Sequence, residues 1–295
     1  MKIKNYTRIL DKHAKIPYNE GKHFWEVIMA DWILSFFQYY FLSLFYTLGA
    51  IVICGLVAYF STKAFITLTG GGKFVYVTSL IGTPIHELGH AVMCLLFGHK
   101  ITEMKLLLPP RHPSGTLGYV SHSYSRKNPW AKLGNLFIGV GPIFSGLAVI
   151  ILALLVCFPT EWNAYLCATA ELHSGAPLSD LAKATFSLLL SLPQAFSDTP
   201  WRALIGLVII LFVAQHITLS TADIKGSLSA FPLYLLLLLI LTIPTKLLGV
   251  DGFILDTLFA FHLRILSFFA LSITFTLLWL VPAILIWAIR RILGK

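Results

Sequence analysis

The chain has 295 residues, of which 57% are hydrophobic and only 12% are charged, and its mean hydropathy is +0.80. This composition excludes an ordinary water-soluble globular protein. The formal net charge is +9, but the basic residues are dispersed among short polar segments, where lipid headgroups explain them better than nucleic acid does. We therefore expect a lipid bilayer as a partner and no nucleic acid.

Six apolar runs have about the length that a helix needs to cross a bilayer. They cover residues 36–60, 74–97, 133–158, 201–219, 231–244 and 265–289. The fifth run is the shortest, and a re-entrant or tilted segment would fit it as well. The sequence therefore predicts an all-α polytopic membrane protein with about six transmembrane helices.

The distribution of the 22 Lys and Arg residues predicts an orientation. Most of them lie before the first run, between the second and third runs, and after the last run. By the positive-inside rule, both termini are expected to face the cytoplasm. The basic start of the chain lacks the apolar core and cleavage site of a signal peptide, so we expect the first span to remain as an anchor. We expect a multi-pass protein in the inner membrane of a bacterium.

The second apolar run contains the pentapeptide HELGH, residues 86–90. On a helix, His86 and His90 project from the same face, so both imidazoles can bind one tetrahedral Zn²⁺, and Glu87 can reach a water on that metal. Ionisable residues within an apolar span are costly and are functional candidates by default. The pattern predicts one zinc ion per chain, with Glu87 as general base. The alternative is a buried polar cluster that only packs helices together.

Between the second and third runs, the pattern changes to that of short strands. Residues 100–108 alternate in part, prolines follow, and residues 115–123 have the glycine-flanked, aromatic and β-branched character of a strand. We predict a small β-hairpin with an open edge at the cytoplasmic face, after the HExxH helix. Tyr119 and Val120 are the residues expected to pair there with an extended substrate.

Outside the HELGH motif, histidines and cysteines lack the spacing of a metal site. His99, His112 and His122 lie in the loop and could be ligands, but without metal spacing they are interpreted as solvated side chains. The four cysteines include no CxxC pair, which argues against a disulfide framework and against a cysteine zinc site. Cys94 is interpreted as a packing residue.

The third run begins with LGNLFIGVGPIFSG. Its small residues allow a neighbouring backbone to approach closely, and Pro142 favours a kink, so we expect this helix to pack tightly beside the HELGH helix. Asn135 could hydrogen-bond a substrate or an oxyanion, although a hydrogen bond between helices fits as well.

The connector over residues 159–200 is acidic and offers no catalytic spacing. Its semi-apolar segment, residues 181–192, is too short to span and is expected at the outer interface. At the end of the fourth run, His216 and Asp223 are seven residues apart and share a helical face if the helix continues. This polar cluster is the expected source of a third metal ligand.

Taken together, these features resemble the site-2 protease family of intramembrane zinc metalloproteases. The resemblance rests on HELGH within a span, the basic β-rich loop, the Gly-Pro-containing third run and a later carboxylate at a span end, and it covers residues 80–225. In that family, two histidines and an aspartate bind zinc, the intervening glutamate activates water, and transmembrane protein or peptide substrates are cut within the bilayer. The resemblance implies that His86 and His90 are ligands and that Glu87 is the general base.

The chain departs from the family pattern at two places. Ser145 stands where the family often has the Asn of GPxxN, and the LDG motif is replaced by Gly-Val-Asp-Gly at residues 249–252. Depth in the membrane favours Asp223 as the third ligand, because Asp251 is predicted at the outer face. His216 lies at a reachable depth and is favoured as a group that hydrogen-bonds a ligand or packs helices.

The sequence divides into four predicted segments. These are a basic interfacial arm over residues 1–35, a first span and connector over 36–73, a metalloprotease core over 74–230, and C-terminal spans over 231–295. A membrane metal-binding protein or transporter that uses the His, Glu and Asp cluster as an ion site is the main alternative, although no inverted repeat is visible. A catalytically inactive scaffold is a third reading, which the complete HExxH motif disfavours.

Overall fold

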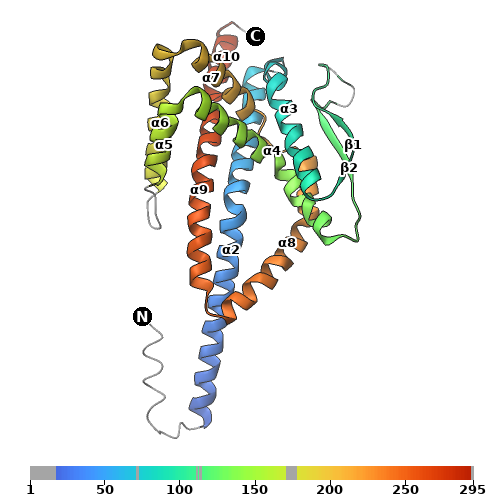
Figure 1. Ribbon diagram of the computed structural model, residues 1–295, viewed down its shortest axis with the longest axis vertical. Helices are drawn as coiled ribbons and strands as arrows, with labels where there is room; N and C mark the ends of the chain where they lie inside the picture. Colours follow the sequence, from blue (N-terminus) through green and yellow to red (C-terminus); the bar gives the residue numbers. More distant parts are fainter. Residues whose placement is uncertain (1–17, 71–72, 111, 113–114, 171–177, 294–295) are drawn as a thin grey trace.

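The computed structural model describes residues 18–70, 73–110, 112, 115–170 and 178–293, and most of these are helical (Figure 1). The described helices are α2 Tyr18–Thr69, α3 Lys73–Leu96, α4 Pro129–Cys157, α5 Pro159–Ala170, α6 Leu178–Asp198, α7 Pro200–Ala214, α8 Thr221–Leu247, α9 Asp251–Leu278 and α10 Leu280–Ile292. Two strands, β1 Lys100–Lys105 and β2 Tyr119–Ser123, form a small sheet. The predicted all-α class with a hairpin after the HExxH helix is confirmed. Residues 1–17 of the predicted basic arm lie outside the described residues.

Four helical segments are long and apolar enough to cross a membrane. They are Glu26–Thr69, Pro129–Cys157, Thr221–Leu247 and Asp251–Ile292. The chain is therefore a helical membrane protein, but the predicted number of about six spans is not confirmed. α7 has only 15 residues, and the polar side chains of HELGH lower the hydropathy of α3.

The helices form a long pair with a more compact group at its side. α2 and α9 pack against each other along the long axis, and α8 runs obliquely towards the point where α9 begins (Figure 1). α3, α4, the hairpin and the start of α8 contact one another beside this pair. The described chain begins and ends at opposite ends of the long axis (Figure 1). The placement of both termini in the cytoplasm stays a prediction.

The boundary between α7 and α8 corrects the sequence analysis. α7 ends at Ala214, whereas the apolar pattern predicts a span to residue 219. The Ser220 hydroxyl accepts the backbone N–H of Asp223, and the Asp223 carboxylate accepts the backbone N–H of Ser220. Because this capping box starts a new helix, His216 and Asp223 do not share one helical face.

α6 and α8 are both longer than predicted. α8 has 27 residues where the sequence predicts a short span over 231–244, and α6 has 21 residues where it predicts a short interfacial segment over 181–192. The predicted bounds stop at or just before Pro244 and Pro193, yet both prolines lie inside helices. Proline favours a helix end in isolation, but packing against neighbouring helices allows the helix to continue.

The hairpin follows the predicted pattern. β1 and β2 pair antiparallel, with Met104 opposite Val120 and Lys105 opposite Tyr119. The second strand begins at Tyr119 and is shorter than the predicted segment 115–123; Gly115 adopts a φ of 68°, which belongs to a turn. Among the described residues β2 pairs with β1 alone, so its other edge is open, as predicted.

α4 packs against both α3 and α8 through glycines. A Cβ atom on Gly141 would lie 2.6 Å from the carbonyl oxygen of Gly89 in α3. A Cβ atom on Gly139 would overlap the carbonyl oxygen of Asp223 and the hydroxyl of Ser227 in α8. The backbones touch only because these positions lack side chains. The predicted tight packing of α4 beside the HELGH helix is confirmed. The same glycine-rich surface also contacts the start of α8.

Replacement of Gly139 by alanine should force α4 and α8 apart. Overpacking of this kind costs about 1–3 kcal/mol. We expect a lower thermal unfolding midpoint for the detergent-purified Gly139→Ala variant, measured by circular dichroism. Gly252→Ala in α9 is the matched control, because nothing lies within 4 Å of its Cβ position. Equal midpoints for the two variants would contradict the contact.

Candidate metal centre

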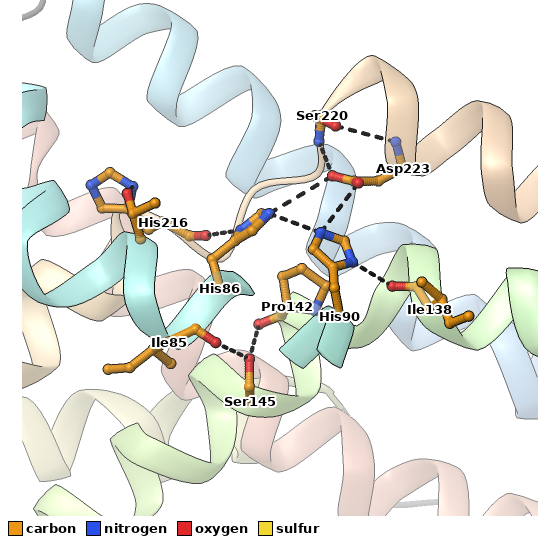
Figure 2. A network of polar contacts seen from close by, with 10 residues as sticks. Ile85, His86, His90, Ile138, Pro142, Ser145, His216, Ser220 and Asp223 are labelled. Atoms are coloured by element: carbon orange, nitrogen blue, oxygen red, sulfur yellow. Dashed lines mark hydrogen bonds and ion pairs between the residues drawn. The ribbon is translucent and has the colours of Figure 1, made fainter. Parts of the chain in front are cut away.

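His86 and His90 lie one turn apart in the second half of α3, and their rings meet on the side that faces α4 and α8 (Figure 2). The two Nε2 atoms are 3.2 Å apart, and the ring centroids are 4.9 Å apart. The local cause is the helical repeat, which brings side chains four residues apart onto one face. The predicted pairing of these two side chains is therefore present.

Backbone carbonyl groups fix both imidazole rings. His86 Nδ1–H donates to the carbonyl oxygen of His216 at 2.8 Å, and His90 Nδ1–H donates to that of Ile138 at 2.7 Å (Figure 2). Because a carbonyl group only accepts hydrogen bonds, the proton of each neutral ring is on Nδ1, and the Nε2 lone pair is available to a metal. Metal-binding histidines are commonly oriented by a second hydrogen bond of this kind.

Pro142 explains why the Ile138 carbonyl is available. In a regular helix, that oxygen would accept the backbone N–H of the residue four positions later, which here is Pro142. Proline has no N–H, so the carbonyl of Ile138 lacks its helical donor and accepts the His90 ring instead. Pro142, the predicted kink residue, therefore frees the Ile138 carbonyl to orient the His90 ring.

Asp223 reaches the two histidines from the first turn of α8. Its Oδ1 lies 3.2 Å from His90 Nε2, and its Oδ2 lies 3.8 Å from His86 Nε2. Oδ2 also accepts the backbone N–H of Ser220 at 2.7 Å. The capping box that starts α8 therefore also aims the carboxylate at α3 (Figure 2).

Three acceptor atoms converge at this point. His86, His90 and Asp223 each offer one ligand atom, and these atoms lie within 4.8 Å of one another. Neutral imidazole nitrogens and a carboxylate all present lone pairs, so their close approach is repulsive unless a cation lies between them. Donors on a tetrahedral zinc with bonds of about 2.0–2.1 Å are about 3.3 Å apart, close to the spacing here. The group can therefore hold a metal ion.

The other two ligand candidates lie outside this group. Asp251 follows the far end of α8 and forms an ion pair with Lys246 at 2.6 Å. The His216 ring hydrogen-bonds Thr78 on α3, with Nε2 2.9 Å from its Oγ1. His216 thus packs helices with its ring and orients His86 with its backbone carbonyl. No sequence pattern indicates the role of that carbonyl, because every residue has one.

A cavity of about 630 Å³ opens beside the three ligand candidates. It is lined by Glu87, by Tyr119 and Val120 of β2, and by Asn135 of α4. Glu87 is only 6% exposed, and the chain before β2 packs on it, since a Cβ atom on Gly118 would lie 2.9 Å from Glu87 Cγ. The structure therefore brings the predicted general base and the predicted substrate-binding residues to one cavity.

Asn135 and Ser145 both hydrogen-bond within the protein. Asn135 Nδ2 donates to Tyr124 Oη at 2.7 Å, beside the cavity. Ser145 Oγ donates to the carbonyl oxygen of Ile85 at 2.8 Å and so joins α4 to α3 next to His86 (Figure 2). At the position where the site-2 protease pattern often has Asn, this chain has a hydroxyl that anchors two helices.

The structure corrects the interpretation of the loop histidines as solvated. His99 is 4% exposed, and its Nδ1 lies 2.9 Å from His122 Nδ1. Cys94 belongs to the same cluster. Burial lowers the pKa of His122, and the nearby rings of His99 and His90 lower it further. Sequence reasoning missed the cluster because its members belong to a helix end, a turn and a strand, without a regular spacing.

Comparison of the chain with protein-family models, with curated proteins and with solved structures finds no match. The site is therefore defined by the geometry of its own residues.

Loss of the Asp223 carboxylate should remove metal binding at the site of His86 and His90. Asp223→Asn retains an oxygen that can accept the Ser220 N–H, whereas Asp223→Ala loses that hydrogen bond and keeps only the bond from its own backbone N–H to the Ser220 hydroxyl. We expect both variants to lose zinc affinity by more than about 100-fold, the upper range for residues that merely support a ligand. The measurement is metal content by mass spectrometry after dialysis against a weak chelator.

Asp251→Ala is the control for this prediction and should keep its metal, because Asp251 lies at the other end of α8. Full occupancy in both Asp223 variants would exclude that carboxylate from the site.

Proposed function

We propose that the protein is an intramembrane zinc metalloprotease of the site-2 protease type. The observation that carries the proposal is the convergence of His86, His90 and Asp223 beside a cavity that also contains Glu87, in a helical membrane protein. These three residues would hold the zinc ion. A bound Zn²⁺ would supply a Lewis acid that acidifies water and polarises a carbonyl group.

Glu87 would transfer the proton. It follows His86 directly in α3, and it lines the cavity without belonging to the group of ligand atoms. Its carboxylate would accept a proton from the attacking water as the new C–O bond forms. It would deliver that proton to the amide nitrogen as the C–N bond breaks. A transporter has no need of a carboxylate between its two ligand histidines, which favours hydrolysis.

β2 would hold the substrate in an extended form. The peptide bonds of a transmembrane helix are shielded by its own hydrogen bonds and side chains, so a substrate helix must unwind before it is cut. The open edge of β2 carries backbone groups that an extended peptide can pair with, at Tyr119 and Val120 beside the cavity. The proposed substrates are therefore transmembrane proteins or peptides.

α3 and α7 would add to the membrane-spanning part of the protein, in the inner membrane of a bacterium. The surface of α3 supports this proposal, because Glu87 and His90 are buried whereas Leu88, Val92 and Leu95 are exposed. An exposed apolar face suits contact with lipid, and the buried polar face suits contact with α4 and α8.

Glu87→Gln should keep the metal and lose cleavage. The amide has the size of the carboxylate but cannot accept the proton, and general base catalysis contributes about 10²–10⁴-fold. We expect unchanged zinc content and a rate reduced by that factor for a transmembrane peptide in proteoliposomes, followed by mass spectrometry of the products.

Glu161→Gln is the matched control, since Glu161 is a buried glutamate on α5. Wild-type cleavage by Glu87→Gln would refute the protease proposal. Metal flux into vesicles without any cleavage by the wild type would favour the transporter.

Proline in β2 should impair cleavage without releasing the metal. Alternate N–H groups of a strand point to opposite edges, so either Tyr119→Pro or Val120→Pro removes a donor from the open edge. We expect that variant to cleave several-fold more slowly, in line with the roughly 1 kcal/mol of one hydrogen bond.

Lys105→Pro and Met104→Pro are the controls. Lys105 and Met104 lie in β1 opposite Tyr119 and Val120, so proline at either position would weaken the same hairpin. Equal losses from both strands would reduce β2 to a structural element.

A further inference from the structure

A second cluster of metal-binding side chains lies close to the first. Cys94, His99 and His122 each place one ligand atom within 4.8 Å of the others. Cys94 and His99 are buried, and His122 is half-buried. Cys94 follows His90 by four residues on α3, so the two clusters are about one helical turn, roughly 6 Å, apart along the axis.

The end of α3 brings His99 onto Cys94. The backbone N–H of His99 donates to the carbonyl oxygen of Cys94 at 2.8 Å, and that of Gly98 donates to Leu95 at 3.2 Å. With Gly98 at a φ of 71°, these bonds form the Schellman pattern, which folds the residue after the glycine back onto the last turn. The two side chains that this pattern brings together are usually apolar, but here they are the Cys94 thiol and the His99 imidazole.

Two contacts aim a lone pair of His99 into the cluster. Its Nε2–H donates to the carbonyl oxygen of Ala131 at 2.7 Å, so the ring carries its proton on Nε2 and a lone pair on Nδ1. The Tyr124 ring stacks on the imidazole with a centroid separation of 4.5 Å and restricts its rotation. Nδ1 then faces His122 Nδ1 at 2.9 Å. The Ala131 carbonyl orients His99 as those of His216 and Ile138 orient the first pair of rings.

We propose that Cys94, His99 and His122 form a second metal site, separate from that of His86, His90 and Asp223, which binds Zn²⁺ or a similar thiophilic divalent cation. One thiolate and two imidazoles are a donor set that suits Zn²⁺. Nitrogen donors on tetrahedral zinc are about 3.3 Å apart, so the two Nδ1 atoms need to separate by only a few tenths of an ångström. Without an ion, His122 Nδ1–H would donate to His99 and the thiol would only pack.

The second site would join the hairpin to α3. Cys94 belongs to the helix, His99 to the turn after it and His122 to β2. His122 also lines the cavity beside His86 and His90. A metal ion here would fix the position of β2 relative to the first site. The inference does not depend on whether the protein is a protease.

Cobalt distinguishes the two sites because only the second contains a thiolate. Co²⁺ would be titrated into the purified full-length protein after removal of metals by a chelator, with two readouts. Mass spectrometry gives the number of ions per chain, and the thiolate-to-cobalt charge-transfer absorption in the near ultraviolet reports the second site alone. We expect two ions per chain and one charge-transfer band.

Substitutions assign the signals. Cys94→Ser and His122→Asn should each lose the band and one ion, whereas His86→Ala should lose one ion and keep the band. His122 is a half-buried strand residue, so His122→Asn provides the test if Cys94→Ser fails to fold. Cys54→Ser is the matched control, a buried cysteine on α2 outside the cluster, and should keep both ions.

The outcomes separate the two sites. A single ion without the band in the wild type, or an unchanged band in Cys94→Ser, would overturn the second site. A single ion that gives the band, and that His86→Ala retains, would support the second site and count against the proposed catalytic one.

Discussion

Backbone contact at the glycines of α4 is the constraint on which the metal centre depends. Gly141 meets Gly89 of α3, and Gly139 meets the Asp223 carbonyl at the start of α8. Side chains at these positions would hold the two neighbours apart, and ligand atoms now 3.2–3.8 Å from one another would no longer reach one ion. The small residues of α4 thus set the distance between histidines and carboxylate, although none of them is a ligand.

Helix packing brings the histidine rings together, and backbone carbonyl groups then orient them. Three histidine rings in the two clusters each donate a hydrogen bond to a backbone carbonyl. His86 donates to His216, His90 to Ile138, and His99 to Ala131. These acceptors fix which nitrogen carries the proton, and they do so differently at the two clusters. At the first, the lone pairs are on Nε2, whereas His99 offers Nδ1. Since a misplaced proton would turn a ligand into a donor, these hydrogen bonds decide whether each cluster can bind a cation.

The sequence by itself determined the features that depend on local repeats. HELGH places two histidines on one face because the helical period is local. The hairpin could be predicted because alternation, glycines and prolines mark strands and turns within a few residues, and apolar length marks a membrane protein. Helix ends were predicted less well. Prolines inside α6 and α8 did not end these helices, and α7 ends at Ala214 although the apolar pattern continues to residue 219.

Only the tertiary structure decided which distant groups meet. Asp223 reaches His90 from 133 positions further along the chain, and His122 meets His99 from another element. Such contacts depend on how helices cross, and no local spacing encodes a crossing. Burial likewise depends on the tertiary structure. His99 is buried by α4 and Tyr124 and not by its sequence neighbours, so the sequence alone suggested a solvated loop residue. Packing energy is collective, so the residues that form a site are recognised by their neighbours in space.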